Sequence, residues 1–193
     1  METNFLAQKP DIILINGSTG AFSALKDFLG TLKHLPVPIV VAIHIPTNAN
    51  ETLMQIWGDH DTSIPLAQAD QRITDGVVFA PPGQHISIGR DADHVARIRL
   101  SVPTEGALAP SIDRLLLSAA DVFQYPVAVM LSGFGSDGQQ AVDVFAQKQL
   151  PVLIQDPKSA MEPDIPINAG LVSPQSPQLT VREIAKVLHQ ACS

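Results

Sequence analysis

The sequence predicts an α/β fold: a single doubly wound, mostly parallel sheet flanked by helices. Short runs of Val, Ile and Leu recur along the chain without strict alternation of apolar and polar residues, which is typical of strands buried on both faces of a parallel sheet. Segments with helical spacing of apolar residues separate these runs. Strands that alternate with helices imply right-handed crossovers between parallel strands, as in Rossmann-like folds.

The first strand is expected at 12–16 (IILIN), where an apolar run ends in a turn of small residues before a helical pattern at 20–33. A second apolar run at 37–45 (VPIVVAIHI) predicts the next strand, and helical spacing follows at 49–57. Because consecutive strands in such sheets are normally neighbours, the first two strands should lie side by side.

The middle of the chain adds a third strand and then interrupts the alternation of strands and helices. The turn signal Asp75-Gly76 introduces the strand that begins the segment 77–83. Next, 85–100 (HISIGRDADHVARIRL) contains two short strand patterns around a turn region, which predicts a small antiparallel hairpin addition. The stretch 101–113 contains Pro and Gly and is expected to be a loop.

The last part of the chain returns to the alternating pattern. Further strands are expected at 127–132 (VAVMLS) and 151–156 (PVLIQD). Helical spacing predicts helices at 111–121, 136–148 and 179–192.

Composition bounds the class of protein. The chain has 193 residues, 45% hydrophobic and 16% charged, so we expect one globular domain that spans residues 1–193. The net charge of −7 and the lack of a basic block argue against nucleic acid as a partner. The single cysteine, Cys192, excludes an internal disulfide and a cysteine-based zinc site.

Targeting and metal signals are weak. The N-terminal sequence lacks the layout of a signal peptide, and no apolar run approaches the roughly 20 residues that span a bilayer. A cytoplasmic protein without membrane insertion is expected. Residues 58–61 (GDHD) carry metal-capable side chains, but no second cluster stands at ligand spacing; neither a metal nor a cofactor is expected.

Polar residues stand at the carboxyl ends of the predicted strands, where ligands bind in open α/β sheets. Ser18 follows the first strand, His44 closes the second, His85 follows the third, and Asp137 lies in a glycine-flanked loop after 127–132. A serine becomes a nucleophile when an imidazole takes its proton and a carboxylate orients that imidazole. A helix that starts just after Ser18 adds N–H groups for an oxyanion.

Each residue also has a structural alternative. Ser18 before a helix is a favoured N-cap, His44 is compatible with a buried hydrogen-bonded histidine, and Asp137 with an acid at a helix start. A dinucleotide-binding turn at 16–21 (NGSTGA) is weakly supported, because the full G-x-G-x-x-G is absent and His44 stands where an acidic residue is needed. Asn16 breaks the G-x-S-x-G pattern of the α/β-hydrolases.

Six segments resemble, in chain order, those of the CheB-type protein-glutamate methylesterase catalytic domain, and the resemblance spans roughly the whole chain. The segments are INGSTGA (15–21), VVAIHIP (40–46), DGVVFAPPGQH (75–85), PSIDRLLLSAA (110–120), VMLSGFGSDGQQA (129–141) and IQDPKSAMEPDIP (154–166). The resemblance implies hydrolysis of glutamate γ-methyl esters in the cytoplasmic region of methyl-accepting chemoreceptors, with release of methanol, and deamidation of certain glutamines.

By motif, the resemblance makes Ser18 the nucleophile, His44 the base and Asp137 the orienting acid. The backbone N–H groups of Thr19 and Phe134 would form the oxyanion hole, in which they bind the negative oxygen of the intermediate. His85 would line the cleft. No cofactor is implied.

This chain departs from the family pattern in three places. Asn16 and Ala21 replace glycines of the first turn and Phe134 replaces the usual Met, while Asp164 and Ile165 replace Gly-Met. The first strand is expected at residue 12, which leaves no room for the family's receiver domain, so control would come from a separate regulatory protein or from a removed domain. Two alternatives remain: a CheB-like binding module without turnover, and a hydrolase of a different small ester.

Overall fold

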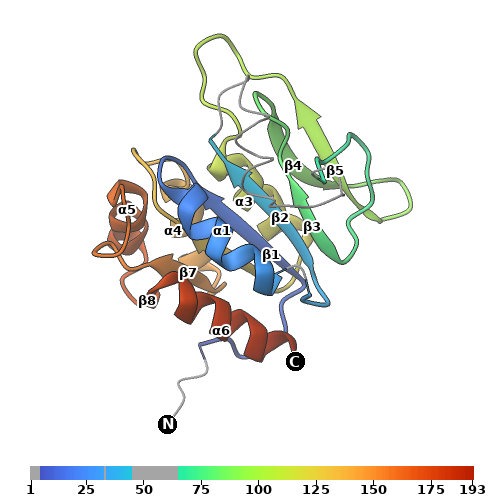
Figure 1. The fold of residues 1–193 in the computed structure, drawn as a ribbon. Helices are drawn as coiled ribbons and strands as arrows, with labels where there is room; N and C mark the ends of the chain where they lie inside the picture. The colour runs from blue at the N-terminus through green and yellow to red at the C-terminus, as the bar shows by residue number, and fades with distance from the viewer. Residues whose placement is uncertain (1–4, 33, 45–64) are drawn as a thin grey trace.

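The computed structural model describes residues 5–32, 34–44 and 65–193, and in this part of the chain six strands form one parallel sheet (Figure 1). Their order across the sheet is β3-β2-β1-β6-β7-β8. The strands are β1 (Ile12–Gly17), β2 (Pro38–Ile43), β3 (Gly76–Phe79), β6 (Pro126–Met130), β7 (Val152–Gln155) and β8 (Gln178–Leu179).

The chain order makes the sheet doubly wound. From β1 the chain moves outward to β2 and β3, then returns to the other side of β1 and continues through β6, β7 and β8. The direction of winding therefore reverses between β1 and β6, which pair in parallel with Asn16 opposite Met130. In open α/β sheets, a crevice for ligands lies beyond the carboxyl ends of the strands at such a point.

Helices α1 (Ala21–Leu32) and α6 (Val181–Cys192) cover one face of the sheet, side by side in Figure 1. Their apolar faces pack on Ile13 and Ile15 of β1 in one buried cluster. The intervening residues Ile12 and Leu14 belong to a second buried cluster on the opposite face. Strand β1 is thus buried on both faces, which confirms the prediction from its unbroken apolar run.

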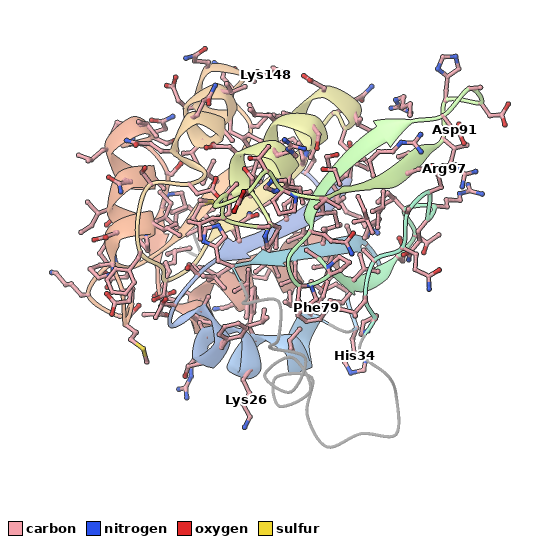
Figure 2. All side chains as sticks on the ribbon, turned by 90° about the horizontal axis from the view of Figure 1, so that it is seen from above. Lys26, His34, Phe79, Asp91, Arg97 and Lys148 are labelled. Carbon is pink, nitrogen blue, oxygen red and sulfur yellow. The ribbon has the colours of Figure 1, made fainter. Side chains whose placement is uncertain are left out.

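The opposite face is covered by α3 (Ile112–Val122), α4 (Gln139–Gln147) and α5 (Asp164–Val172). The antiparallel pair β4 (His85–Arg90) and β5 (Ala96–Ser101) packs against α3. This pair is the predicted hairpin addition. Asp91 organises its turn by accepting the N–H groups of Asp93 and Val95, and its carboxylate forms an ion pair with Arg97 at the tip (Figure 2).

The expected helices at 20–33, 111–121, 136–148 and 179–192 are confirmed to within a few residues. The one at 49–57 lies outside the described residues. Helix α5 was not predicted. Its apolar residues form no single stripe, since Ile165 and Ala169 are buried whereas Ile167 and Leu171 are exposed, and Pro166 looks like a helix breaker although the first turn tolerates proline.

In the described ranges, no helix combines the length and the apolar character needed to cross a membrane.

Candidate active site

Ser18 and His44 lie side by side at the carboxyl edge of the sheet. Gly17 pairs with Ile43 in the β1–β2 ladder, and the N–H of His44 donates to the Gly17 carbonyl at 3.1 Å. On the other side, the N–H of Ser18 donates to the Ser132 carbonyl at 2.9 Å. The pairing therefore continues one residue beyond the strand ends, and the register places Ser18 next to His44.

The Ser18 hydroxyl does not cap α1. That helix begins at Ala21, whose N–H donates to the Ser18 carbonyl at 3.0 Å. The side-chain oxygen of Ser18 makes no hydrogen bond with any described residue, and the residue is 8% exposed. The hydroxyl is therefore free to engage the neighbouring imidazole, a contact that in enzymes often tightens only when substrate is bound.

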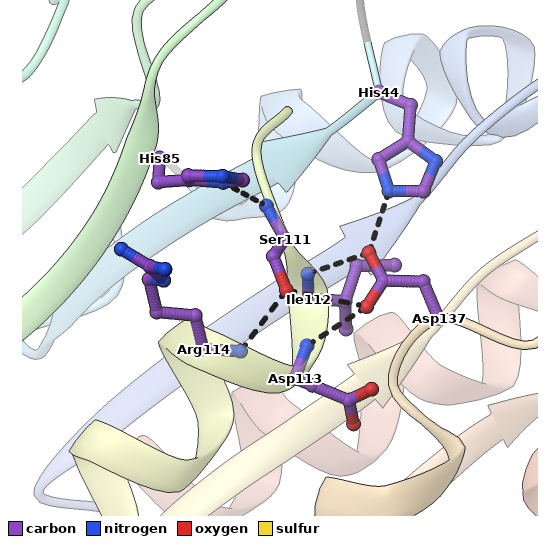
Figure 3. Close-up of polar contacts among 7 residues, drawn as sticks. All are labelled: His44, His85, Ser111, Ile112, Asp113, Arg114 and Asp137. Atoms are coloured by element: carbon purple, nitrogen blue, oxygen red, sulfur yellow. Dashed lines mark hydrogen bonds and ion pairs between the residues drawn. The ribbon is translucent and has the colours of Figure 1, made fainter. Parts of the chain in front are cut away.

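The His44 ring is paired with Asp137, which comes from the loop between β6 and α4. His44 Nε2 lies 2.8 Å from Asp137 Oδ2 (Figure 3), and the two side chains are 7% and 19% exposed. An ionised carboxylate only accepts hydrogen bonds, so Nε2 carries the hydrogen in the neutral ring. Nδ1 is left as the ring atom that can accept a proton.

Asp137 is also held by the N-terminus of α3. The N–H of Ile112 donates to Oδ2 at 2.8 Å and the N–H of Asp113 donates to Oδ1 at 3.1 Å (Figure 3). Burial raises the pKa of Asp137, but the hydrogen bonds from the His44 ring and from these two N–H groups outweigh it and hold the pKa below its ordinary value. The carboxylate therefore stays ionised near neutral pH.

Asp113, whose N–H binds Asp137, in turn caps the N-terminus of α4 with its side chain. Its Oδ1 accepts the N–H of Ala141 at 2.7 Å. Burial raises the pKa of Asp113, N–H groups at the start of α4 oppose the rise, and the nearby Asp137 carboxylate adds to it. Gly138 makes the close approach feasible: its φ is 95°, and a Cβ there would lie 2.7 Å from both Ile112 Cγ2 and Met130 Cε. The N-termini of α3 and α4 are thus joined by reciprocal hydrogen bonds, with the Asp137 carboxylate between them.

Two backbone N–H groups flank Ser18 without an acceptor. Within the described segments, the N–H groups of Thr19 and Phe134 make no hydrogen bond to another protein group. The segment that carries Phe134 lies against Ser18, because a Cβ on Gly133 would come within 2.6 Å of Ser18 Cβ and 2.8 Å of its backbone nitrogen. The Phe134 side chain is 55% exposed. Free N–H groups near a nucleophile are what binding of an oxyanion requires.

A buried polar pair fixes the loops around Ser18. The Ser132 hydroxyl donates to the Thr19 carbonyl at 2.9 Å and accepts the N–H of Glu162 at 2.9 Å. Gln155 Oε1 accepts the N–H of Ser132 at 2.9 Å. Both side chains are buried. The turn after β1, the loop after β6 and the segment before α5 are therefore joined at one point, which the sequence did not predict because no local pattern marks it.

The segment that departs from the family pattern is fastened to the loop at Phe134. Asp164 Oδ2 accepts the N–H of Gly135 at 3.2 Å. The N–H of Ile165 donates to the Gly133 carbonyl at 2.9 Å, and the Ile165 side chain is buried. The Asp164 carboxylate and the buried Ile165 side chain, which packs against Gly133, thus contribute to holding the loop beside Ser18.

His85 has a different environment from His44. It is buried, and its Nδ1 accepts the N–H of Ser111, the N-cap of α3, at 3.0 Å. Burial lowers the pKa of His85, the positive charge of Arg114 lowers it further, and the Asp137 carboxylate opposes both (Figure 3). His85 is thus a neutral ring that contacts Asp137 only indirectly, through the start of α3.

No group of three or more His, Cys, Asp or Glu side chains that could hold a metal occurs among the described residues. The metal-capable stretch 58–61 lies outside them.

A family model described as CheB methylesterase matches residues 13–188. The chain is 32% identical over 139 residues to a protein-glutamate methylesterase/protein-glutamine glutaminase of Anaeromyxobacter dehalogenans, covering 68% of this chain and 40% of that protein. Proteins of the same name in Trichodesmium erythraeum and Paramagnetospirillum magneticum are each 31% identical, covering 88% and 92% of this chain and 50% and 48% of theirs. The chain thus spans about half the length of these curated relatives.

The fold also matches a solved structure. The crystal structure of the Thermotoga maritima CheB methylesterase catalytic domain superimposes with a TM-score of 0.82 and 22% sequence identity, covering 94% of this chain and 98% of that one.

Proposed function

Because the chain belongs to the CheB methylesterase family, we propose that it hydrolyses glutamate γ-methyl esters of methyl-accepting chemoreceptors and deamidates glutamines there. In this proposal Ser18 is the nucleophile, His44 the general base and Asp137 the orienting carboxylate. The observation that carries it is the 2.8 Å contact between His44 Nε2 and Asp137 Oδ2, combined with a strand register that sets His44 beside Ser18.

The reaction runs in two halves. His44 Nδ1 takes the Ser18 hydroxyl proton while Oγ attacks the ester carbonyl carbon, and the resulting imidazolium donates to Asp137 through Nε2. As the tetrahedral intermediate collapses, the C–O bond to methanol breaks and Nδ1 returns the proton to the departing methoxide. Water, deprotonated by the same nitrogen, then attacks the acyl-enzyme and frees the glutamate and Ser18. A glutamine amide follows the same course with ammonia as the leaving group.

Backbone N–H groups around Ser18 and Asp137 would stabilise the charges that develop in the transition state. The N–H groups of Thr19 and Phe134 would hold the negative oxygen, because both are unengaged among the described residues. Thr19 follows Ser18 in the chain, and Phe134 follows Gly133, which lies against Ser18. The N-terminus of α3 keeps Asp137 ionised and in place. No metal or cofactor takes part in this route. His85 would line the cleft as a neutral polar side chain rather than as a base.

The partners follow from the reaction. The substrate would be the cytoplasmic region of a chemoreceptor, presented as an extended helix, since contacts remote from the ester help to position the carbonyl. Control would come from a separate regulatory protein or an attached domain. Methanol release from a methylated receptor fragment, measured with the isolated chain, tests the proposal. Failure to release methanol from a fragment that a known methylesterase demethylates would refute it.

Replacing Asp137 with Asn should lower turnover by on the order of 10⁴-fold, as for orienting carboxylates in other triads. Asn retains the shape, but its amide can present a donor to Nε2 and favour the wrong tautomer of His44. The matched control is Asp121→Asn, since Asp121 is an exposed carboxylate that forms a surface ion pair with Lys148 at 3.2 Å, and such pairs contribute little. Methanol release and the melting temperature are compared in both variants. A loss of only about twofold in Asp137→Asn would mark Asp137 as structural, far from the expectation for a triad.

A further inference from the structure

Asn16 is a fully buried polar residue that the mechanism above does not use. It lies on β1, two residues before Ser18, and its exposed fraction is 0%. Its side-chain nitrogen donates to the carbonyls of Leu14 at 2.9 Å and Val129 at 3.3 Å. Its side-chain oxygen, Oδ1, has no hydrogen-bond partner among the described residues, the only buried side-chain atom of that kind found there.

The two carbonyls fix which way the amide points. If the amide were turned over, Oδ1 would face two carbonyl oxygens, and oxygen atoms that only accept would repel one another. Oδ1 is therefore held as the free end. A buried acceptor without a partner is costly, and such groups in folded proteins call for an explanation such as a functional role.

The strand register indicates the direction of the free end. Side chains alternate along a strand, so Asn16 and Ser18 lie on the same face of β1, the face covered by α3 and α4. Asn16 is opposite Ala42, two residues before His44, and opposite Met130. Both carbonyls that bind the nitrogen lie toward the amino-terminal side of Asn16. The oxygen, on the other side of the amide carbon, is thereby directed toward the carboxyl edge, where Ser18 and His44 stand.

We propose that Asn16 is a positioning residue that acts through His44, by presenting its side-chain oxygen to the ring as the ring takes the Ser18 proton. The negative end of a fixed amide dipole favours the positive charge that develops there, and in a buried site such a dipole acts more strongly than in water. The proposal rests on the proposed roles of Ser18 and His44.

The test is Asn16→Leu, which keeps the branched shape of the side chain without an oxygen. We expect kcat for the receptor methyl ester to fall about tenfold, less than the loss of a direct oxyanion donor, with KM unchanged. Labelling of Ser18 by a fluorophosphonate, which needs no ester substrate, should slow by the same factor. The melting temperature should change little, because leucine removes the unpaired buried acceptor together with the two hydrogen bonds of the side-chain nitrogen.

Gln155→Leu is the matched control for stability. Gln155 is also a buried amide, but both of its ends are bonded: Oε1 accepts from Ser132 and Nε2 donates to the Ser159 carbonyl at 3.3 Å. Its replacement should lower the melting temperature where Asn16→Leu does not. Asn16→Ala is a second variant that lacks the oxygen and is smaller than leucine, so poor packing of leucine cannot explain its behaviour. It should show the same slower labelling of Ser18.

Equal labelling rates in the wild type and both Asn16 variants would overturn the proposal, as would a raised KM with unchanged kcat. The labelling assay also separates this inference from the proposed function. If the wild type is labelled at Ser18 but releases no methanol from receptor, the substrate assignment fails while the labelling rates of the variants still decide the role of Asn16.

Discussion

Replacing Ser18 with Ala is expected to reduce ester hydrolysis by on the order of 10⁶-fold, as in other serine hydrolases that lose their nucleophile. Ser18 is the serine that the strand register places beside His44, and alanine removes the attacking oxygen while it retains the Cβ that packs near Gly133. The fold should survive, because the hydroxyl makes no hydrogen bond to a described residue and caps no helix.

Methanol release and thermal melting measured on the same samples check this expectation. Ser23→Ala is a suitable control, since Ser23 is an exposed serine of α1, close to Ser18 in the chain, and its loss should leave the rate unchanged. A soluble, folded Ser18→Ala variant with full turnover would remove Ser18 from the mechanism.

Replacing His44 with Gln is expected to produce a loss of the same order, because without the base the serine keeps its proton. His85→Gln is the informative comparison. His44 directly follows β2 and His85 is the first residue of β4, and both are near the start of α3 (Figure 3). His44 contacts a carboxylate, whereas His85 accepts a backbone N–H from Ser111. We therefore expect a much smaller loss in His85→Gln.

Rates for the two histidine variants are best compared at several substrate concentrations, so that effects on KM and kcat separate. If His85→Gln were inert while His44→Gln kept the full rate, the base would have been assigned to the wrong histidine.

Much of the sheet was predictable because its strands are buried on both faces. Their unbroken apolar runs and the turn residues that follow them place Ser18 and His44 at one edge, and the neighbour rule correctly made β1 and β2 adjacent. The same reasoning located the hairpin of β4 and β5. These inferences depend on local patterns, which the sequence displays directly.

The support around Asp137 could not be predicted in this way. Its carboxylate binds the N–H groups of α3, a helix that begins 25 residues earlier in the chain, and no local pattern announces such a contact. The junction at Ser132 and Gln155 likewise depends on three segments that meet only in the folded chain. Helix α5 escaped prediction because its apolar residues point both inward and outward.

The altered residues at the start of α5 have a clearer role than the sequence suggested. Asp164 and Ile165 bond to the loop of Gly133 and Gly135, so these replacements are compatible with an ordered loop at the proposed oxyanion site. They sit beside exposed apolar side chains, with Phe134 at 55% and Met161 at 67% exposed. Such a surface favours a large substrate, although a small ester would reach Ser18 as well.

The proposed activity, a serine esterase for receptor glutamate methyl esters, is tested by a comparison of two substrates. Methanol release from a methylated receptor helix is compared with hydrolysis of a simple aryl acetate, at equal enzyme concentration and with Ser18→Ala as the blank. We expect kcat/KM for the receptor helix to exceed that for the aryl acetate, and both activities to vanish in the blank. Cleavage of the aryl acetate alone would contradict it and favour a hydrolase of small esters, and cleavage of neither would favour a binding module.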